Sequence, residues 1–198
     1  MVSSGHQSVN LQPEFFPSAG TIQPGETANS ETYNLLPGRA GVFQTADAMT
    51  ACVKGEIGPD HNGFQSEAVN RIAKEIETIF FGQSFAQAVF SYAQFCLQYD
   101  EHPFDVQICQ DAVTTYVTGK GDCVSMSVFI ATLLASRGIP VCFVFQDVTG
   151  SEYTHVYCEA LINRQLVALD AVSKEPMGWR QPLLPSGFET TWLISNME

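Results

Sequence analysis

The sequence predicts an α+β fold, in which helices come first and a further helix then packs on a small antiparallel sheet. Residues 62–81 and 83–99 carry apolar side chains at the spacing of amphipathic helices. A long apolar stretch, residues 123–136, follows a glycine-rich turn and ends before Gly138 and Pro140. Three β-rich segments joined by short turns follow it.

The composition indicates one globular domain with a sizeable core. The chain has 198 residues, of which 45% are apolar and 15% are charged. Its 21 acidic and 9 basic residues give a net charge of −12, which disfavours binding to nucleic acids. No apolar run approaches the roughly 20 residues of a membrane span, and the N-terminus lacks the basic and apolar regions of a secretory signal. We therefore expect no nucleic-acid partner and no membrane insertion.

The cysteines indicate a reducing compartment at the time of folding. There are six of them, and no two have the C-x-x-C spacing of a zinc knuckle, so we expect no metal and no other cofactor. Cys96, Cys142 and Cys158 lie within apolar runs, where a reduced cysteine behaves as a small hydrophobic residue.

Residues 1–38 differ from the rest of the chain. They are rich in Ser, Gln, Pro, Gly and Asn, and they contain no Lys or Arg. Two interpretations stay open: a disordered tail, or an extended arm that docks on a neighbouring chain. Proline on both sides of Phe15 and Phe16 favours an extended conformation, in which a partner would bury these two rings.

The remainder, residues 39–198, is predicted to form the domain. We expect a helical part at 39–98, a core at 99–180 and a C-terminal segment at 181–198. Residues 41–58 have loosely helical spacing, and residues 100–122 look like a loop. The predicted strands are residues 139–148, 153–162 and 165–172, and Asn163–Arg164 forms the hairpin turn between the last two.

The hairpin brings a histidine close to a carboxylate. Side chains alternate along a strand, so His155 shares a face with Tyr157 and Glu159. Antiparallel pairing then places His155, near the start of one strand, beside Asp170, near the end of the next. A carboxylate that accepts one ring N–H orients the imidazole, which can then take a proton from a nucleophile. Each residue alone is more often structural, and their arrangement is what favours a site.

Cys123 supplies a nucleophile at the start of the apolar helix. The N-terminus of a helix carries partial positive charge and free N–H groups, which stabilise a thiolate and can bind the oxyanion of an acyl intermediate. We expect this helix to pack on the face of the sheet that carries His155 and Asp170.

The sequence then resembles a known family. The motifs "GKGDC", "LLASRGIPVCFVF" and "THVYCEALINRQLVALDAV" are similar to those of the transglutaminase-like superfamily of papain-like cysteine enzymes. The preceding "LLPGRAGVFQTADAM" and the later "DAVSKEPMGWR" resemble the compact members found in bacteriophage genomes. Those members have two acidic residues after the cysteine, where this chain has Val124 and Ser125, and a proline where it has Ala171.

The resemblance implies a papain-like fold and a catalytic triad. By this match Cys123 is the nucleophile, His155 the general base and acid, and Asp170 the orienting carboxylate. A second oxyanion donor should come from an upstream segment, and Gln107 and Gln110 are candidates by position, with a plain loop role as the alternative.

Two functions follow from the resemblance. One is a cysteine hydrolase or acyl transferase that acts on amide bonds, with a peptide or a cell-wall peptide as substrate. The other is a catalytically silent structural protein that uses the fold as a docking module. In both cases the resemblance implies a component of a phage particle, in its tail or baseplate region, that is assembled in the host cytoplasm and contacts other virion proteins through the arm.

Overall fold

The computed structural model describes residues 30–34, 39–56, 63–101, 106–147, 155–183 and 187–194. Helices and strands are both present, as the α+β prediction requires. The helices are α1 (Arg39–Lys54), α2 (Glu67–Ile79), α3 (Phe85–Cys96), α4 (Ala112–Thr118) and α5 (Cys123–Ala135). The strands are β1 (Ser30–Asn34), β2 (Gln98–Tyr99), β3 (Val106–Gln110), β4 (Lys120–Gly121), β5 (Val141–Gln146), β6 (His155–Ile162), β7 (Gln165–Leu169) and β8 (Glu189–Leu193).

The largest sheet has four antiparallel strands in the order β7-β6-β5-β8. The predicted hairpin between β6 and β7 is present, and its two turn residues, Asn163 and Arg164, have φ angles of 51° and 66°. Positive φ at both central residues is the requirement of a type I′ turn, whose twist matches that of paired strands. The turn therefore sets the register that aligns β6 with β7.

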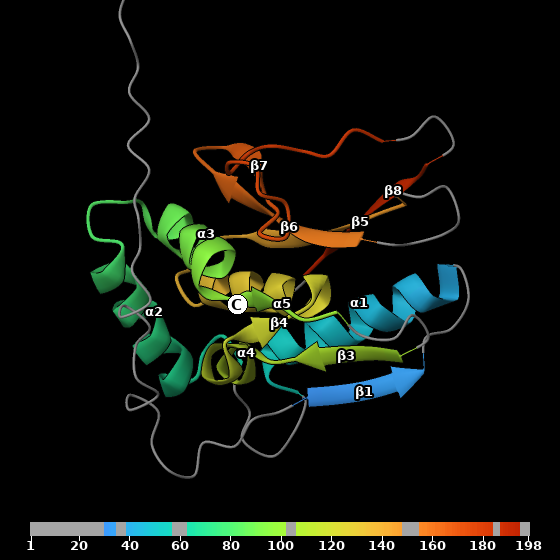
Figure 1. Cartoon of the computed structure of the whole chain (residues 1–198), viewed down its shortest axis with the longest axis horizontal. Coiled ribbons are helices and arrows are strands. Elements are labelled where there is room, and N and C mark those ends of the chain that lie inside the picture. The colour runs from blue at the N-terminus through green and yellow to red at the C-terminus, as the bar shows by residue number, and fades with distance from the viewer. Residues whose placement is uncertain are drawn as a thin grey trace, which may run out of the picture.

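Helix α5 lies at the centre of the molecule. In Figure 1 it lies between the four-stranded sheet and a layer that contains α1, α4 and the β1–β3 pair. All of its residues after Cys123 are buried, which is the environment expected for a helix that is apolar on every side. The packing holds the N-terminus of α5 in a fixed position relative to the sheet.

Helices α2 and α3 begin at serine N-caps. Oγ of Ser66 accepts a hydrogen bond from the Val69 N–H, and Oγ of Ser84 accepts one from the Gln87 N–H. The apolar stripe of α2 is buried as its periodicity predicts. Both helices therefore follow from local sequence. None of the described helices is long and apolar enough to cross a membrane.

The prediction of a loop at residues 100–122 is wrong. The segment contains β3, α4 and β4. Helix α4 has only seven residues, between an Asp111 N-cap and Gly119 at φ 66°, so its periodicity is too short to recognise. β3 and β4 pair with strands distant in sequence, β1 and β2. Strand β8, in the predicted C-terminal segment, was also not foreseen because it forms by pairing with β5.

Strand β1 lies within the predicted arm. Its residues are extended, and they pair antiparallel with β3 of the same chain. The end of the segment 1–38 therefore contacts its own domain. Phe15 and Phe16, which we predicted to contact a partner, lie outside the described residues.

Candidate active site

Cys123 is the first residue of α5, and Asp122 is its N-cap. Oδ1 of Asp122 accepts a hydrogen bond from the Ser125 N–H at 2.8 Å, and its carbonyl accepts one from the Met126 N–H at 2.9 Å. The N–H groups of Cys123 and Val124 donate to no described residue. These are unpaired donors at the positive end of the helix dipole. The thiol therefore lies beside two groups that can bind an anion.

His155 and Asp170 are in direct contact, as the hairpin predicts. Nε2 of His155 lies 2.9 Å from Oδ2 of Asp170, and both side chains are largely buried. Oδ1 of Asp170 accepts hydrogen bonds from the N–H groups of Val172 and Ser173, which hold the carboxylate in place. Because Nε2 faces the carboxylate, Nδ1 is the ring nitrogen left to exchange a proton with the thiol.

The imidazole is in an environment that favours its charged form. Burial alone would lower the pKa of His155, but hydrogen bonds and Coulombic attraction from Asp170 and Cys123 outweigh burial and raise it to about 10. The contribution of Cys123 means that the thiol and the imidazole are neighbours. The arrangement brings a thiol, an imidazole and a carboxylate together, as nucleophilic catalysis requires.

The expectation that α5 packs on the face carrying His155 and Asp170 is wrong. Ser127 of α5 donates to the Val156 carbonyl and accepts from the Cys158 thiol, so the helix covers the row of Val156 and Cys158. His155 instead belongs to the row of Tyr157, whose ring stacks on it at 6.1 Å. The thiol reaches the imidazole because it lies at the end of the helix, where it meets the start of β6.

The two glutamines predicted as oxyanion donors have other partners. Nε2 of Gln107 donates to Oδ2 of Asp122 at 2.7 Å and to the Ile108 carbonyl at 3.2 Å, which engages both of its hydrogens. The Gln110 side chain accepts a hydrogen bond from Thr115 at 3.5 Å. Gln107 therefore lies next to the site and braces Asp122, whereas Gln110 is directed toward α4.

Tyr99 is a residue of the site that sequence reasoning missed. It is on β2 and pairs with Gly121 of β4, two residues before Cys123. Burial, and then the charges of Cys123, Asp122 and Glu101, raise the pKa of its phenol to about 12. The only sequence signal was an aromatic residue after the end of α3, which is too common to identify a site.

Val124 and Ser125, the two residues that follow Cys123 in α5, face the interior. Both are completely buried. Oγ of Ser125 lies 3.4 Å from the Ile108 carbonyl and 3.4 Å from the Gln110 N–H, so it joins α5 to β3. These two side chains therefore serve packing.

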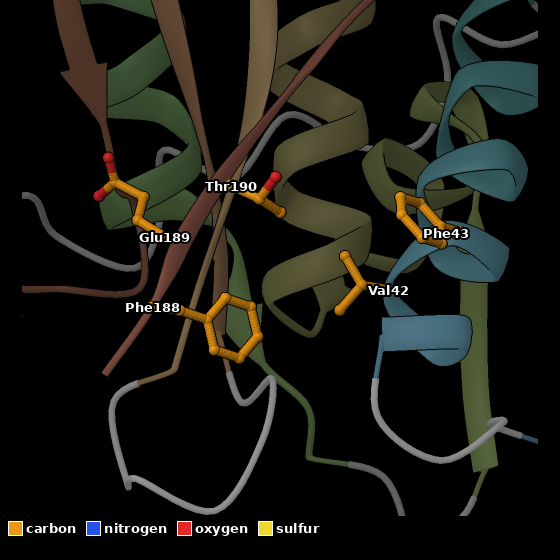
Figure 2. Close-up of a pocket in the computed structure, with 5 residues that line it drawn as sticks. All are labelled: Val42, Phe43, Phe188, Glu189 and Thr190. Carbon is orange, nitrogen blue, oxygen red and sulfur yellow. The ribbon is translucent and has the colours of Figure 1, made fainter. Parts of the chain in front are cut away.

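A hollow of about 190 Å³ lies between the start of α1 and the start of β8. Figure 2 shows Val42 of α1 across from Phe188 and Thr190, while Glu189 points to the opposite side of its strand. Gln146 pairs with both Glu189 and His155, so the hollow is at the same end of the sheet as the histidine, two strands away.

The described residues contain no cluster of three or more His, Cys, Asp or Glu side chains that could hold a metal ion. The six cysteines are free thiols, and four of them are buried.

Residues 67–171, more than half of the chain, match the sequence model described as the transglutaminase-like superfamily. None of the curated proteins compared with the chain matches it.

Two solved structures are similar in part. A candidate cysteine protease from Cytophaga hutchinsonii has 12% identity and a TM-score of 0.42, over 72% of this chain and 48% of its own. A candidate protease from Parabacteroides distasonis has 10% identity and a TM-score of 0.42, over 71% of this chain and 27% of its own. The chain thus spans less than half of the length of either.

Proposed function

Because the chain belongs to the transglutaminase-like superfamily, we propose that it is a cysteine enzyme that cleaves or transfers the acyl group of an amide. The observation that carries the proposal is the contact of His155 with Asp170, together with the influence of Cys123 on the same imidazole. A nucleophile, a base and an orienting carboxylate are the three parts that such chemistry needs.

The reaction follows from the positions of these groups. The Cys123 thiolate attacks the amide carbonyl, and an S–C bond forms while the carbonyl oxygen becomes an oxyanion. The backbone N–H groups at the start of α5 are placed to stabilise that charge. The imidazolium of His155 gives its Nδ1 proton to the departing amine as the C–N bond breaks, while Asp170 holds Nε2–H. Water or a second amine then takes the acyl group from sulfur.

Selective alkylation of Cys123 by iodoacetamide tests the proposal. At about pH 6 an unpaired thiol, with its usual pKa of about 8.5, is almost entirely protonated and reacts slowly. Paired with His155, Cys123 should react far faster than the other five cysteines, as peptide mass spectrometry can measure. Cys123→Ala should remove the fast reaction and all hydrolytic activity, and change the free energy of unfolding by only about 1 kcal/mol.

Cys96→Ala is the matched control. Cys96 is also partly exposed, but burial raises the pKa of its thiol to about 11, so its loss should not change the fast alkylation. Slow, uniform labelling of all six cysteines would refute the enzymatic proposal and favour the silent structural role.

We also propose, on the resemblance of the sequence motifs, that the protein is a component of a phage particle. The charge of −12 and the arm without Lys or Arg suit a part that docks on other proteins and not on nucleic acid. Deletion of residues 1–29 keeps β1 and tests the arm: the truncated protein should fold but fail to enter particles, as mass spectrometry of purified particles can measure. Normal incorporation would contradict the role of the arm.

A further inference from the structure

The short parallel pair of β2 and β4 places a tyrosine next to the nucleophile. Tyr99 pairs with Gly121, and the Asp100 N–H donates to the Gly121 carbonyl at 3.1 Å. The Gln98 N–H donates to the Gly119 carbonyl at 2.8 Å, so the pairing is held on both sides of Tyr99. The backbone of Tyr99 therefore lies beside the turn that leads into Cys123.

The phenol of Tyr99 is available as a donor. Its side chain is 47% exposed, and its hydroxyl makes no hydrogen bond to any described residue. The thiol of Cys123 and the carboxylate of Asp122 are close enough that, after burial, they are the main causes of its raised pKa of about 12. At neutral pH the hydroxyl therefore keeps its proton, and it can donate to negative charge that develops beside the thiol during acyl transfer.

The two glutamines predicted as oxyanion donors make hydrogen bonds to other described residues. Both hydrogens of the Gln107 amide are engaged by Asp122 and Ile108, and the Gln110 side chain is turned toward Thr115. The backbone N–H groups of the first turn of α5 remain, and they approach the carbonyl from the helix alone. A hydroxyl that reaches the same oxygen from β2 would complete a two-sided cradle.

We propose that the Tyr99 hydroxyl donates a hydrogen bond to the oxyanion that forms when the Cys123 thiolate attacks a carbonyl. The inference rests on the proposed function and assigns to that reaction a catalytic residue on a different element from the triad. Because the phenol makes no hydrogen bond to any described residue, none of these has to be displaced when the hydroxyl donates to the tetrahedral intermediate.

Two reactions of the same thiol separate this role from a general effect on the nucleophile. With p-nitrophenyl acetate, the thiolate forms an S–C bond through an oxyanion, and p-nitrophenolate leaves as the C–O bond breaks. With iodoacetamide, the thiolate displaces iodide at a saturated carbon, and no oxyanion forms. Tyr99→Phe should slow the acylation burst by roughly 100-fold, the lower end of the cost of losing one oxyanion donor, and leave the alkylation rate at its wild-type value.

Tyr116→Phe is the matched control. It also removes a phenol oxygen, but from a ring on α4 that stacks on Tyr92, and it should change neither rate. An acylation rate of Tyr99→Phe equal to that of the wild type would overturn the proposal. An equal reduction of the acylation and alkylation rates would also overturn it, because Tyr99 would then act on the thiolate. If Cys123 of the wild type is not alkylated selectively, the proposed function fails first, and the assignment of Tyr99 fails with it.

Discussion

The two faces of the four-stranded sheet are built from the same strands but carry different chemistry. On the face that packs against α5, Phe143 pairs with Cys158 and Phe145 pairs with Val156, and all four are buried. The other face carries the charged and most of the polar side chains of the sheet, beside a small buried apolar cluster of Val144, Tyr157 and Ala168. The residues of this polar face are Gln146, His155, Tyr157, Glu159, Asp170 and Glu189, with Arg180 beside them.

The two faces hold together in different ways. The apolar face is stabilised by the area it removes from water, which does not depend on exact partners. Several groups of the polar face are also buried, and these need partners: Glu159 lies 2.6 Å from Arg180, and Gln146 donates to Glu189 at 2.7 Å. We therefore expect stability to depend chiefly on one face, whereas the candidate site lies at the end of the other face.

The largest effect should follow from a change on the polar face, and it should be on the rate of acylation and not on stability. Asp170→Asn removes the charge that attracts the His155 proton and disturbs the orientation of the ring, so burial should lower the pKa of His155. By comparison with the Asp→Asn change in a serine triad, acylation by p-nitrophenyl acetate should slow about 10⁴-fold. The burst kinetics and the imidazole titration by NMR measure the two effects.

Asp170→Glu keeps the charge and serves as the control. The pKa of His155 in this variant should lie closer to the wild-type value than it does in the asparagine variant. An asparagine variant with normal acylation would contradict the role of the carboxylate and make this end of the polar face structural.

The second largest effect should follow from a change on the apolar face, and it should be on stability and not on the rate of alkylation. Phe143 is completely buried against α5, so Phe143→Ala should lower the free energy of unfolding by about 3–5 kcal/mol. Urea denaturation measures the change, and alkylation of the folded fraction should proceed at the wild-type rate. Leu193→Ala, on a side chain that is 74% exposed, should cost less than about 0.5 kcal/mol. A Phe143→Ala protein that is as stable as the leucine variant would remove the distinction between the faces.

The smallest effect should come from the ion pair on the polar face, and it should depend on pH. Arg180→Met should lower the free energy of unfolding by about 2 kcal/mol near pH 8. This loss is smaller than the loss expected on removing a fully buried partner, because Arg180 is half exposed. Burial already raises the pKa of Glu159, and Arg180 opposes that shift. Without the arginine the folded-state pKa rises further above the unfolded value, so the loss should grow as pH rises and shrink near pH 5.

Lys174→Met is the control for this pair, since Lys174 is exposed in the same segment and should show little change at either pH. Equal destabilisation by Arg180→Met at both pH values would mean that the arginine acts through packing of its aliphatic stem.

The elements that the sequence predicted are those with a local cause. Helices α2 and α3 follow from apolar spacing and serine caps, and the β6–β7 hairpin follows from a two-residue turn. The elements that escaped prediction, among them β1, β4 and β8, have few residues and form by pairing with segments far away in the chain. Such pairing depends on contacts that no window of sequence contains.

The candidate site divides in the same way. The sequence by itself determined that Cys123 begins a helix and that His155 and Asp170 face each other, because a glycine turn, an N-cap and a hairpin register are local. Tertiary structure decided the rest: that Gln107 braces Asp122, and that Tyr99 lies beside the thiol. Those contacts exist because distant segments pack around one helix end, where burial and neighbouring charges change what each polar group can do.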